Sequence, residues 1–486
     1  MEILQMTLAD LHLAMDDGEL TSLELVRFYL DRVAKLNREG ANINAILELN
    51  PELEQLAVLK DRERKLGKAK GPLHGIPVLV KDNIDTHDMM HTSAGSLALK
   101  DHYAEKDSFI AYQLKKAGAI IFGKANMTEW ANFMTINMRN GYSSRGGQVL
   151  NPYGPNVFDV SGSSSGSAAG VATRMVPVAV GTETSGSILS PANMNSLVGI
   201  KPTVGLVSRA GIIPIMFSQD TPGPLALRVE DAAYLLNSMV GIDENDSATW
   251  AAQGRLEEDY TTFVNLKGLQ GKRLGFVTQM DERFTPEKLD LMKRVMEEMT
   301  ANGAKVVTIS DIPGIVELNK KPWFASSSMS YEFKPALNKY LSSVEPHIPV
   351  HSMNDVIRFN QQYAEQCLLY GQVHFIEAQA RSGSLSESEY IEDRKKDVFY
   401  SRELGIDWAL EKYKVDALVF PASSVASLAA KAGYPSIAIP AGYLDSGEPF
   451  GISMTATAWQ EGLLIEIASG YEAITSHRRD PECAKV

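Results

Sequence analysis

The chain of 486 residues contains only two cysteines, Cys367 and Cys483, far apart in the sequence. Two such thiols provide neither a disulfide framework nor a cysteine-rich metal site, and they fit a reducing compartment. Long apolar runs are also missing, since none approaches the roughly 20 residues of a membrane span. The first residues lack the basic flank and apolar run of a signal peptide. We therefore expect a cytoplasmic protein that does not use a membrane as its partner.

Basic side chains are in the minority. The chain has 47 Lys and Arg against 60 Asp and Glu, which gives a formal net charge of −13. A surface of this sign repels the phosphates of nucleic acids and the head groups of anionic membranes. Nucleic acid is therefore not expected as a partner, and a small molecule or peptide is the expected substrate. The charge says nothing about oligomeric state.

The apolar runs that are present are short and rich in β-branched residues, which is typical of strands buried on both faces. Helical patterns alternate with them, for example after Thr21, where Glu24 completes a capping box, and after Thr285, where Pro286 takes the first helical position. This order predicts an α/β fold: one large domain over residues 1–486, with a mixed, mostly doubly wound sheet covered by helices. The predicted strands are 76–80, 119–122, 176–180, 273–277, 305–309, 415–420 and 436–439.

Lys81 follows directly on the first of these strands. Burial of an amine favours its neutral form, which can act as a base. Two simpler interpretations remain open for this residue alone. Its side chain could reach solvent, or it could pair with Asp82.

Two polar loops are further candidate parts of a site that would include this lysine. Residues 161–167 read Ser-Gly-Ser-Ser-Ser-Gly-Ser and open a helical stretch, so their hydroxyls and N–H groups can face a ligand. Residues 181–188 read Gly-Thr-Glu-Thr-Ser-Gly-Ser-Ile and follow the strand at 176–180. A tight turn there can direct several N–H groups at one point, as an oxyanion hole requires. A flexible linker for the first loop and a plain turn for the second are the alternatives.

Taken together, Gly75-Ile76-Pro77-Val78-Leu79-Val80-Lys81-Asp82 and the two loops resemble the amidase signature family. The resemblance runs from about residue 7 to about residue 475 and is densest over 71–225. Residues 181–188, 201–208 and 217–221 look most like the peptide amidase branch. The resemblance implies the amidase signature fold, a signature core at about 71–225, and a variable helical cap at about 315–400 that lines the substrate pocket.

The resemblance also implies a reaction. Ser187 stands where the family has its acylated nucleophile, Ser163 where it has a serine in a cis peptide bond, and Lys81 where it has the base. The oxyanion hole would be formed by the backbone N–H groups of Thr184, Ser185, Gly186 and Ser187. The implied activity is hydrolysis of a carboxamide, a small amide or a peptide C-terminal amide, to a carboxylate plus ammonia or an amine, with no metal or cofactor.

The sequence departs from the common family pattern at several positions. Ser161, Ser165 and Ser185 stand where glycines are usual, Glu183 replaces an aspartate, and Leu189 replaces an arginine. Several of these changes also look like the peptide amidase branch, and they weaken an assignment to the glutamine-hydrolysing subunit of the tRNA amidotransferase. An amidotransferase-like or catalytically degenerate subunit within a complex is the alternative function. We expect the segments near 129–134, 212–219 and 315–400 to line the acyl pocket.

Three competing motifs also occur in the sequence. Gly162 to Gly166 fits the G-x-S-x-G pattern of α/β-hydrolases, which would make Ser164 the nucleophile, but no strand is predicted before it. His87 and His91 have the i, i+4 spacing of a helical zinc site, without the glutamate that such a motif needs. Residues 118–124 read G-x-x-x-x-G-K, but their centre is a predicted strand and Ala125 cannot bind magnesium. All three are disfavoured.

Overall fold

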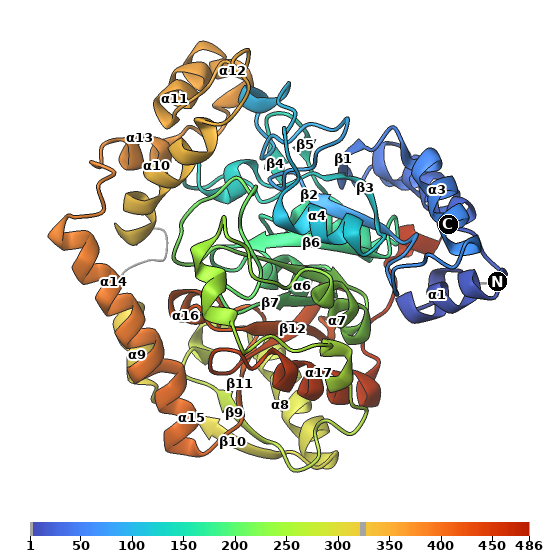
Figure 1. Ribbon diagram of the computed structural model, residues 1–486. Helices are drawn as coiled ribbons and strands as arrows, with labels where there is room; N and C mark the ends of the chain where they lie inside the picture. The colour runs from blue at the N-terminus through green and yellow to red at the C-terminus, as the bar shows by residue number, and fades with distance from the viewer. Residues whose placement is uncertain (1–2, 321–326, 486) are drawn as a thin grey trace.

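The computed structural model describes residues 3–320 and 327–485, which form a single α/β fold (Figure 1). An eleven-stranded sheet crosses the described part of the chain in the order β1-β3-β2-β6-β8-β7-β12-β13-β11-β9-β10, and β4 and β5 form a separate hairpin. The strands are β1 (Ile46–Leu49), β2 (Pro77–Lys81), β3 (Ile120–Ala125), β4 (Tyr142–Ser143), β5 (Gly147–Gln148), β6 (Val178–Glu183), β7 (Val198–Lys201), β8 (Thr221–Ala226), β9 (Arg273–Val277), β10 (Lys305–Ile309), β11 (Ala417–Pro421), β12 (Ser436–Tyr443) and β13 (Pro449–Thr455).

The sheet is mixed. β2 runs parallel to β3 and β6, and β9 runs parallel to β10 and β11. The strands between these two groups pair in antiparallel fashion. All the strands predicted from the sequence are present. The predicted start of the second polar loop was wrong, however, because β6 continues through Gly181 to Glu183.

Four strands of the sheet were not predicted: β1, β7, β8 and β13. The reason is clearest for β8, which carries Pro222 and Pro224. Proline lacks the N–H that a central strand normally donates, so its presence argues against a strand. The strand nevertheless pairs with β6, where Thr182 lies opposite Pro222 and Val180 opposite Pro224.

Helices surround the sheet (Figure 1). Four of them, α5, α6, α7 and α17, pack against its central strands. The predicted capping box at Thr21 and Glu24 and the cap at Thr285 are confirmed. The helices are α1 (Leu8–Asp16), α2 (Ser22–Val33), α3 (Leu53–Lys65), α4 (Phe109–Lys116), α5 (Ser165–Ala172), α6 (Leu189–Met194), α7 (Val229–Asn237), α8 (Pro286–Ala301), α9 (Pro313–Leu318), α10 (Ser327–Leu341), α11 (Met353–Gln362), α12 (Ala364–Cys367), α13 (Val373–Gln379), α14 (Ser388–Ser401), α15 (Asp407–Tyr413), α16 (Ala426–Ala432) and α17 (Glu461–Thr475).

The buried apolar side chains form two clusters. The larger one contains the sheet and the helices packed on it. The smaller one joins α10, α11 and α13 to the segments around Phe133 and Ile215. Helices α9–α14 occupy most of the expected cap at 315–400, and residues 321–326 of that range lie outside the described residues. The helices of the expected cap therefore have an apolar core of their own, which packs on loops next to the sheet.

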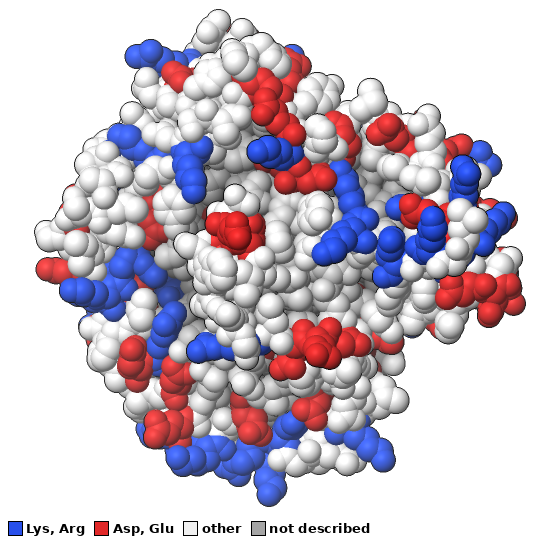
Figure 2. All heavy atoms as spheres, in the orientation of Figure 1, with Lys and Arg blue, Asp and Glu red and all other residues white. Residues whose placement is uncertain are grey.

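Charged side chains on the visible face lie in small clusters of both signs, without a continuous basic stripe (Figure 2). Within the described ranges, no helix is long and apolar enough to cross a membrane. The two chain termini lie on the same side of the molecule (Figure 1).

Candidate active site

Lys81 is the last residue of β2 and is completely buried. Val80 of β2 lies beside Val180 of the parallel strand β6, so the two strands end together and place Lys81 next to Thr182. The Lys81 Nζ donates to Ser163 Oγ at 2.8 Å, to Thr182 Oγ1 at 2.8 Å and to the Thr182 carbonyl at 3.2 Å. The carboxyl ends of parallel strands are the usual position of a site in such sheets.

The surroundings of Lys81 disfavour its charge. Its three hydrogen-bond acceptors are neutral, and no carboxylate among the described residues lies within ion-pair distance of it. Burial lowers the pKa of Lys81 to about 7, and the carboxylates of Asp220 and Glu183 oppose this shift. About half of the molecules with such a pKa carry a neutral amine at pH 7, which is available as a base.

Neither simpler interpretation of Lys81 holds. The side chain does not reach solvent. Nor does it pair with Asp82, because successive residues at a strand end point to opposite faces. The Asp82 carboxylate instead accepts hydrogen bonds from Ser93 and from the Gly95 N–H, and lies 3.5 Å from Arg145.

The serine-rich loop approaches Lys81 from the start of α5. Ser163 is completely buried, and the peptide bond between Gly162 and Ser163 is cis. The next residue, Ser164, exchanges hydrogen bonds with the backbone of Thr182, accepting from its N–H at 3.2 Å and donating to its carbonyl at 3.1 Å. Gly181 permits this close approach, since a Cβ there would lie 2.8 Å from Ser164 Oγ.

The loop from Thr184 to Ser187 connects β6 to α6. Glu183 shapes it, because one of its carboxylate oxygens accepts the N–H groups of Ile188 at 2.7 Å and Leu189 at 2.9 Å. Gly186 has φ +94°, a conformation that favours glycine. Within the described chain, the N–H groups of residues 184–187 have no protein acceptor. Four such donors in one turn can receive an oxyanion.

Ser187 is 8% exposed and faces a cavity of ≈ 310 Å³. The Ser164 N–H donates to the Ser187 carbonyl at 3.3 Å, which holds the two serine loops side by side. Residues from all three segments expected near the pocket contribute to its walls. The described residues that line it are Ala131, Asn132, Phe133, Asn140, Ser161, Gly162, Thr184, Ser185, Gly186, Ser187, Ser190, Ile215, Met329, Ser423, Ser424, Ala426 and Ser427.

Sequence reasoning missed several residues of this site. Thr182 provides two of the three acceptors of Lys81, and Asn83 donates to Thr182 Oγ1 at 3.1 Å. The sequence pattern identifies Glu183 only as a replacement for aspartate. Thr182 lies beside Lys81 because β6 runs three residues past the predicted strand end at 180, where Gly181 indicates a loop in the sequence. Of the three serines at glycine positions, Ser161 and Ser185 line the cavity, while Ser165 is buried and donates to the Ser161 carbonyl at 2.6 Å.

The competing motifs gain no support. Residues 87–91 are not helical, and His91 contacts Glu48 at 2.9 Å. Residues 120–125 are strand β3 rather than a phosphate-binding loop. Residues 150–158 form turns, so no strand leads into Ser164. In the part of the chain that the structure describes, no group of three or more His, Cys, Asp and Glu could hold a metal ion.

Comparison with known proteins identifies the family of this fold and site. The family model described as Amidase matches residues 24–465. The chain belongs to the amidase family. As an amidase, it is an enzyme that hydrolyses amides, in agreement with the resemblance drawn from the sequence.

The amidase is similar to several individual proteins. A probable amidase of Arabidopsis thaliana is 40% identical, with 99% of this chain and 92% of the relative covered. The solved peptide amidase from Stenotrophomonas maltophilia is 42% identical, with 98% of each chain covered and a TM-score of 0.92. A glutamyl-tRNA(Gln) amidotransferase subunit of Pseudomonas syringae is 30% identical, with 98% of this chain and 99% of the relative covered.

Proposed function

We propose that this amidase hydrolyses a neutral carboxamide, such as a peptide C-terminal amide, through an acyl-enzyme on Ser187. Ser163 would relay protons between Ser187 and Lys81, and the N–H groups of Thr184, Ser185, Gly186 and Ser187 would form the oxyanion hole. One observation carries the proposal. A fully buried lysine with a pKa of about 7 donates to Ser163 Oγ at 2.8 Å, beside a loop whose four N–H groups lack protein acceptors.

The chemistry follows from these positions. Ser187 Oγ attacks the amide carbon, its proton passes to Ser163, and the Ser163 proton passes to the neutral amine of Lys81. The carbonyl oxygen becomes an oxyanion that accepts the free N–H groups. When the C–N bond breaks, Lys81 returns the proton through Ser163 to the leaving nitrogen, which departs as ammonia or an amine. Water then attacks the ester carbon and loses one proton along the same route. That proton returns to Ser187 as the C–O bond to Ser187 breaks, and the product leaves as a carboxylic acid that ionises to the carboxylate in water.

The lining of the cavity supports an uncharged group at the reacting end of the substrate. None of the described residues that line it carries a formal charge. Free glutamine has an ammonium and a carboxylate that would need charged partners when removed from water. A peptide amide has neither charge near its reacting group. The solved peptide amidase bound to the competitive inhibitor chymostatin, 42% identical to this chain with a TM-score of 0.92, also supports a peptide substrate.

We also propose that the boundaries inferred from the sequence separate two parts of the chain with different functions. The signature core at about 71–225 would supply the chemistry, and the cap at about 315–400 would select the substrate. Met329 of α10 supports this division, because it lines the cavity from the cap side. A small-molecule or peptide amide as partner and a cytoplasmic location belong to the same proposal.

An amidotransferase-like or degenerate subunit that works only within a complex is the second candidate, favoured by the 30% identity to the amidotransferase protein. The purified chain distinguishes the two. If it releases ammonia from a peptide amide without added proteins, it is an independent amidase. If it does so only in a complex, the second candidate holds.

The nucleophile is tested by labelling. A serine-directed phosphonate should inactivate the amidase, and mass spectrometry should locate the adduct at Ser187. Ser187→Ala should lose the adduct and the ammonia release. Ser167→Ala is the matched control, since Ser167 lies in the same serine-rich stretch but its hydroxyl donates to the Val180 carbonyl at 3.1 Å. An inactive Ser164→Ala together with an active Ser187→Ala would assign the nucleophile to Ser164 instead.

A further inference from the structure

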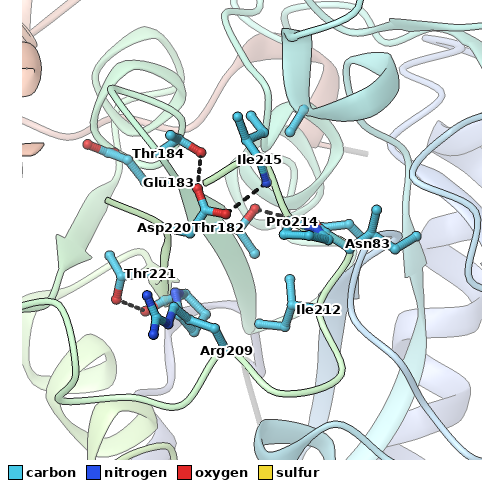
Figure 3. Close-up of a pocket in the computed structure, with 13 residues that line it drawn as sticks. Asn83, Thr182, Glu183, Thr184, Arg209, Ile212, Pro214, Ile215, Asp220 and Thr221 are labelled. Carbon is cyan, nitrogen blue, oxygen red and sulfur yellow. Dashed lines mark hydrogen bonds between the residues drawn. The ribbon is translucent and has the colours of Figure 1, made fainter. Parts of the chain in front are cut away.

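Asp220 lies immediately before β8, in a segment that separates the catalytic loop from the cap. Its carboxylate accepts hydrogen bonds from two different parts of the chain. Oδ1 accepts the Thr184 hydroxyl at 2.5 Å, and Oδ2 accepts the backbone N–H groups of Ile215 at 2.8 Å and Met216 at 2.9 Å. Figure 3 shows Asp220 between Thr184 and Ile215, with dashed lines to both.

These contacts join two walls of the substrate cavity. Thr184 and Ile215 both line the cavity that Ser187 faces. Thr184 belongs to the loop with the unpaired N–H groups, whereas Ile215 belongs to the apolar cluster of the cap. The Asp220 carboxylate therefore bridges the catalytic side and the cap side at the reacting end of the cavity.

The same segment is also held from the cap. The backbone N–H and the hydroxyl of Ser218 donate to the buried Glu332 of α10, at 3.0 and 2.8 Å. A displacement of α10 would thus also displace the segment in which Asp220 is hydrogen-bonded to Thr184. Ser218 and Asp220, two residues apart, therefore connect α10 of the cap to the loop that carries Ser187.

We propose that Asp220 is a positioning residue for amide hydrolysis, because its carboxylate fixes the loop that carries Ser187 against the cap-side wall of the cavity. This inference rests on the proposed function of Ser187 and Lys81. Small displacements of such a loop cost rate rather than folding, since a shift of about 1 Å can reduce turnover about 100-fold.

The charge of Asp220 also acts on Lys81. Asp220 shares a pocket with Arg209 and Glu183, and its charge interacts with Arg209 and with Lys81 of β2. Asp246 and Glu332 of α10 interact in turn with Arg209. Burial raises the pKa of Asp220 to about 6, so the group is mostly ionised at pH 7. Its negative charge favours the protonated form of Lys81. Removal of this charge should lower the pKa of Lys81 and shift the rise of kcat/KM with pH to lower pH.

The experiment compares three variants of the full chain with a peptide amide as substrate. Asp220→Asn removes the charge at nearly constant volume. Thr184→Val removes one hydrogen bond and keeps the backbone N–H. Asp231→Asn is the control, because Asp231 is a buried carboxylate with a pKa raised to about 7 that accepts the Leu8 N–H at 2.8 Å and does not line the cavity. Thermal unfolding verifies that each variant is folded.

We expect Thr184→Val and Asp220→Asn to lower kcat by about 10- to 100-fold with KM changed much less. Asp220→Asn alone should shift the pH profile to lower pH, while Asp231→Asn should change neither kcat nor the profile. If Asp220→Asn does not fold, the kcat of Thr184→Val alone tests the inference. An unchanged kcat in both variants, or an equal loss in Asp231→Asn, overturns the inference and leaves the proposed function standing. A wild-type chain without activity would instead remove the proposed function and this inference with it.

Discussion

The two sides of the substrate cavity are built in different ways. On the core side, Lys81, Ser163 and Ser164 are completely buried, and each makes hydrogen bonds of 2.8–3.3 Å to the ends of adjacent strands or loops. On the cap side, Met329 of α10 and Ile215 of the segment before β8 line the cavity, and both belong to the smaller apolar cluster. Polar groups on rigid strands hold a fixed geometry, whereas apolar helix faces tolerate exchange of side chains. This difference supports the proposal that the core carries the chemistry and the cap selects the substrate.

The largest expected effect is on the core side. Lys81→Met removes the proposed base, so we expect kcat to fall by about 10³-fold or more at neutral pH, measured as ammonia release. Lys201→Met is the matched control. Lys201 is also completely buried, with a pKa lowered to about 8, but its Nζ donates to the Pro202 carbonyl at 2.9 Å. An equal loss in both variants would mean that buried lysines support only the fold.

The second effect concerns stability. Lys81 has an ordinary pKa of 10.5, which the fold lowers to about 7. Between these pH values the unfolded chain binds a proton that the folded chain does not, so the stability contributed at this position rises with pH. The difference in unfolding free energy between wild type and Lys81→Met should rise by about 1.4 kcal/mol per pH unit, approaching this slope above pH 7. Denaturant titrations at pH 7, 8 and 9 measure it. A constant difference would contradict a depressed lysine pKa.

The smallest effect should come from the cap. Met329→Ala enlarges the cavity, so we expect the ratio of kcat/KM between a bulky and a small peptide amide to rise about 10-fold, with little change in kcat for the small one. Met353→Ala is the matched control, because Met353 of α11 is buried in the same cluster and does not line the cavity. It should lose stability without a change in this ratio. A large loss of kcat for the small substrate in Met329→Ala would contradict the proposal that the cap only selects the substrate.

The candidate site could be proposed from the sequence because its residues lie in short segments of recognisable composition. A lysine at the end of a buried strand and two loops of small residues are visible in the sequence, and the family resemblance assigned their roles. The partners could not be predicted in the same way. Asp220, for example, is 36 residues from Thr184 in the chain, and their hydrogen bond exists only because β8 returns beside β6. That strand was not predicted because Pro222 and Pro224 argue against a central strand.

By itself, the sequence determined where several strands lie and where several helices begin, because periodicity and caps are local properties. The candidate lysine and serines came from the resemblance of the sequence to the family. Only the tertiary structure decided that Lys81 is buried among neutral acceptors, that Glu183 and Asp220 fasten the loop of Ser187, and that Met329 reaches the cavity. The physical reason is that a pKa and a cavity wall depend on groups that the fold brings together from distant parts of the chain.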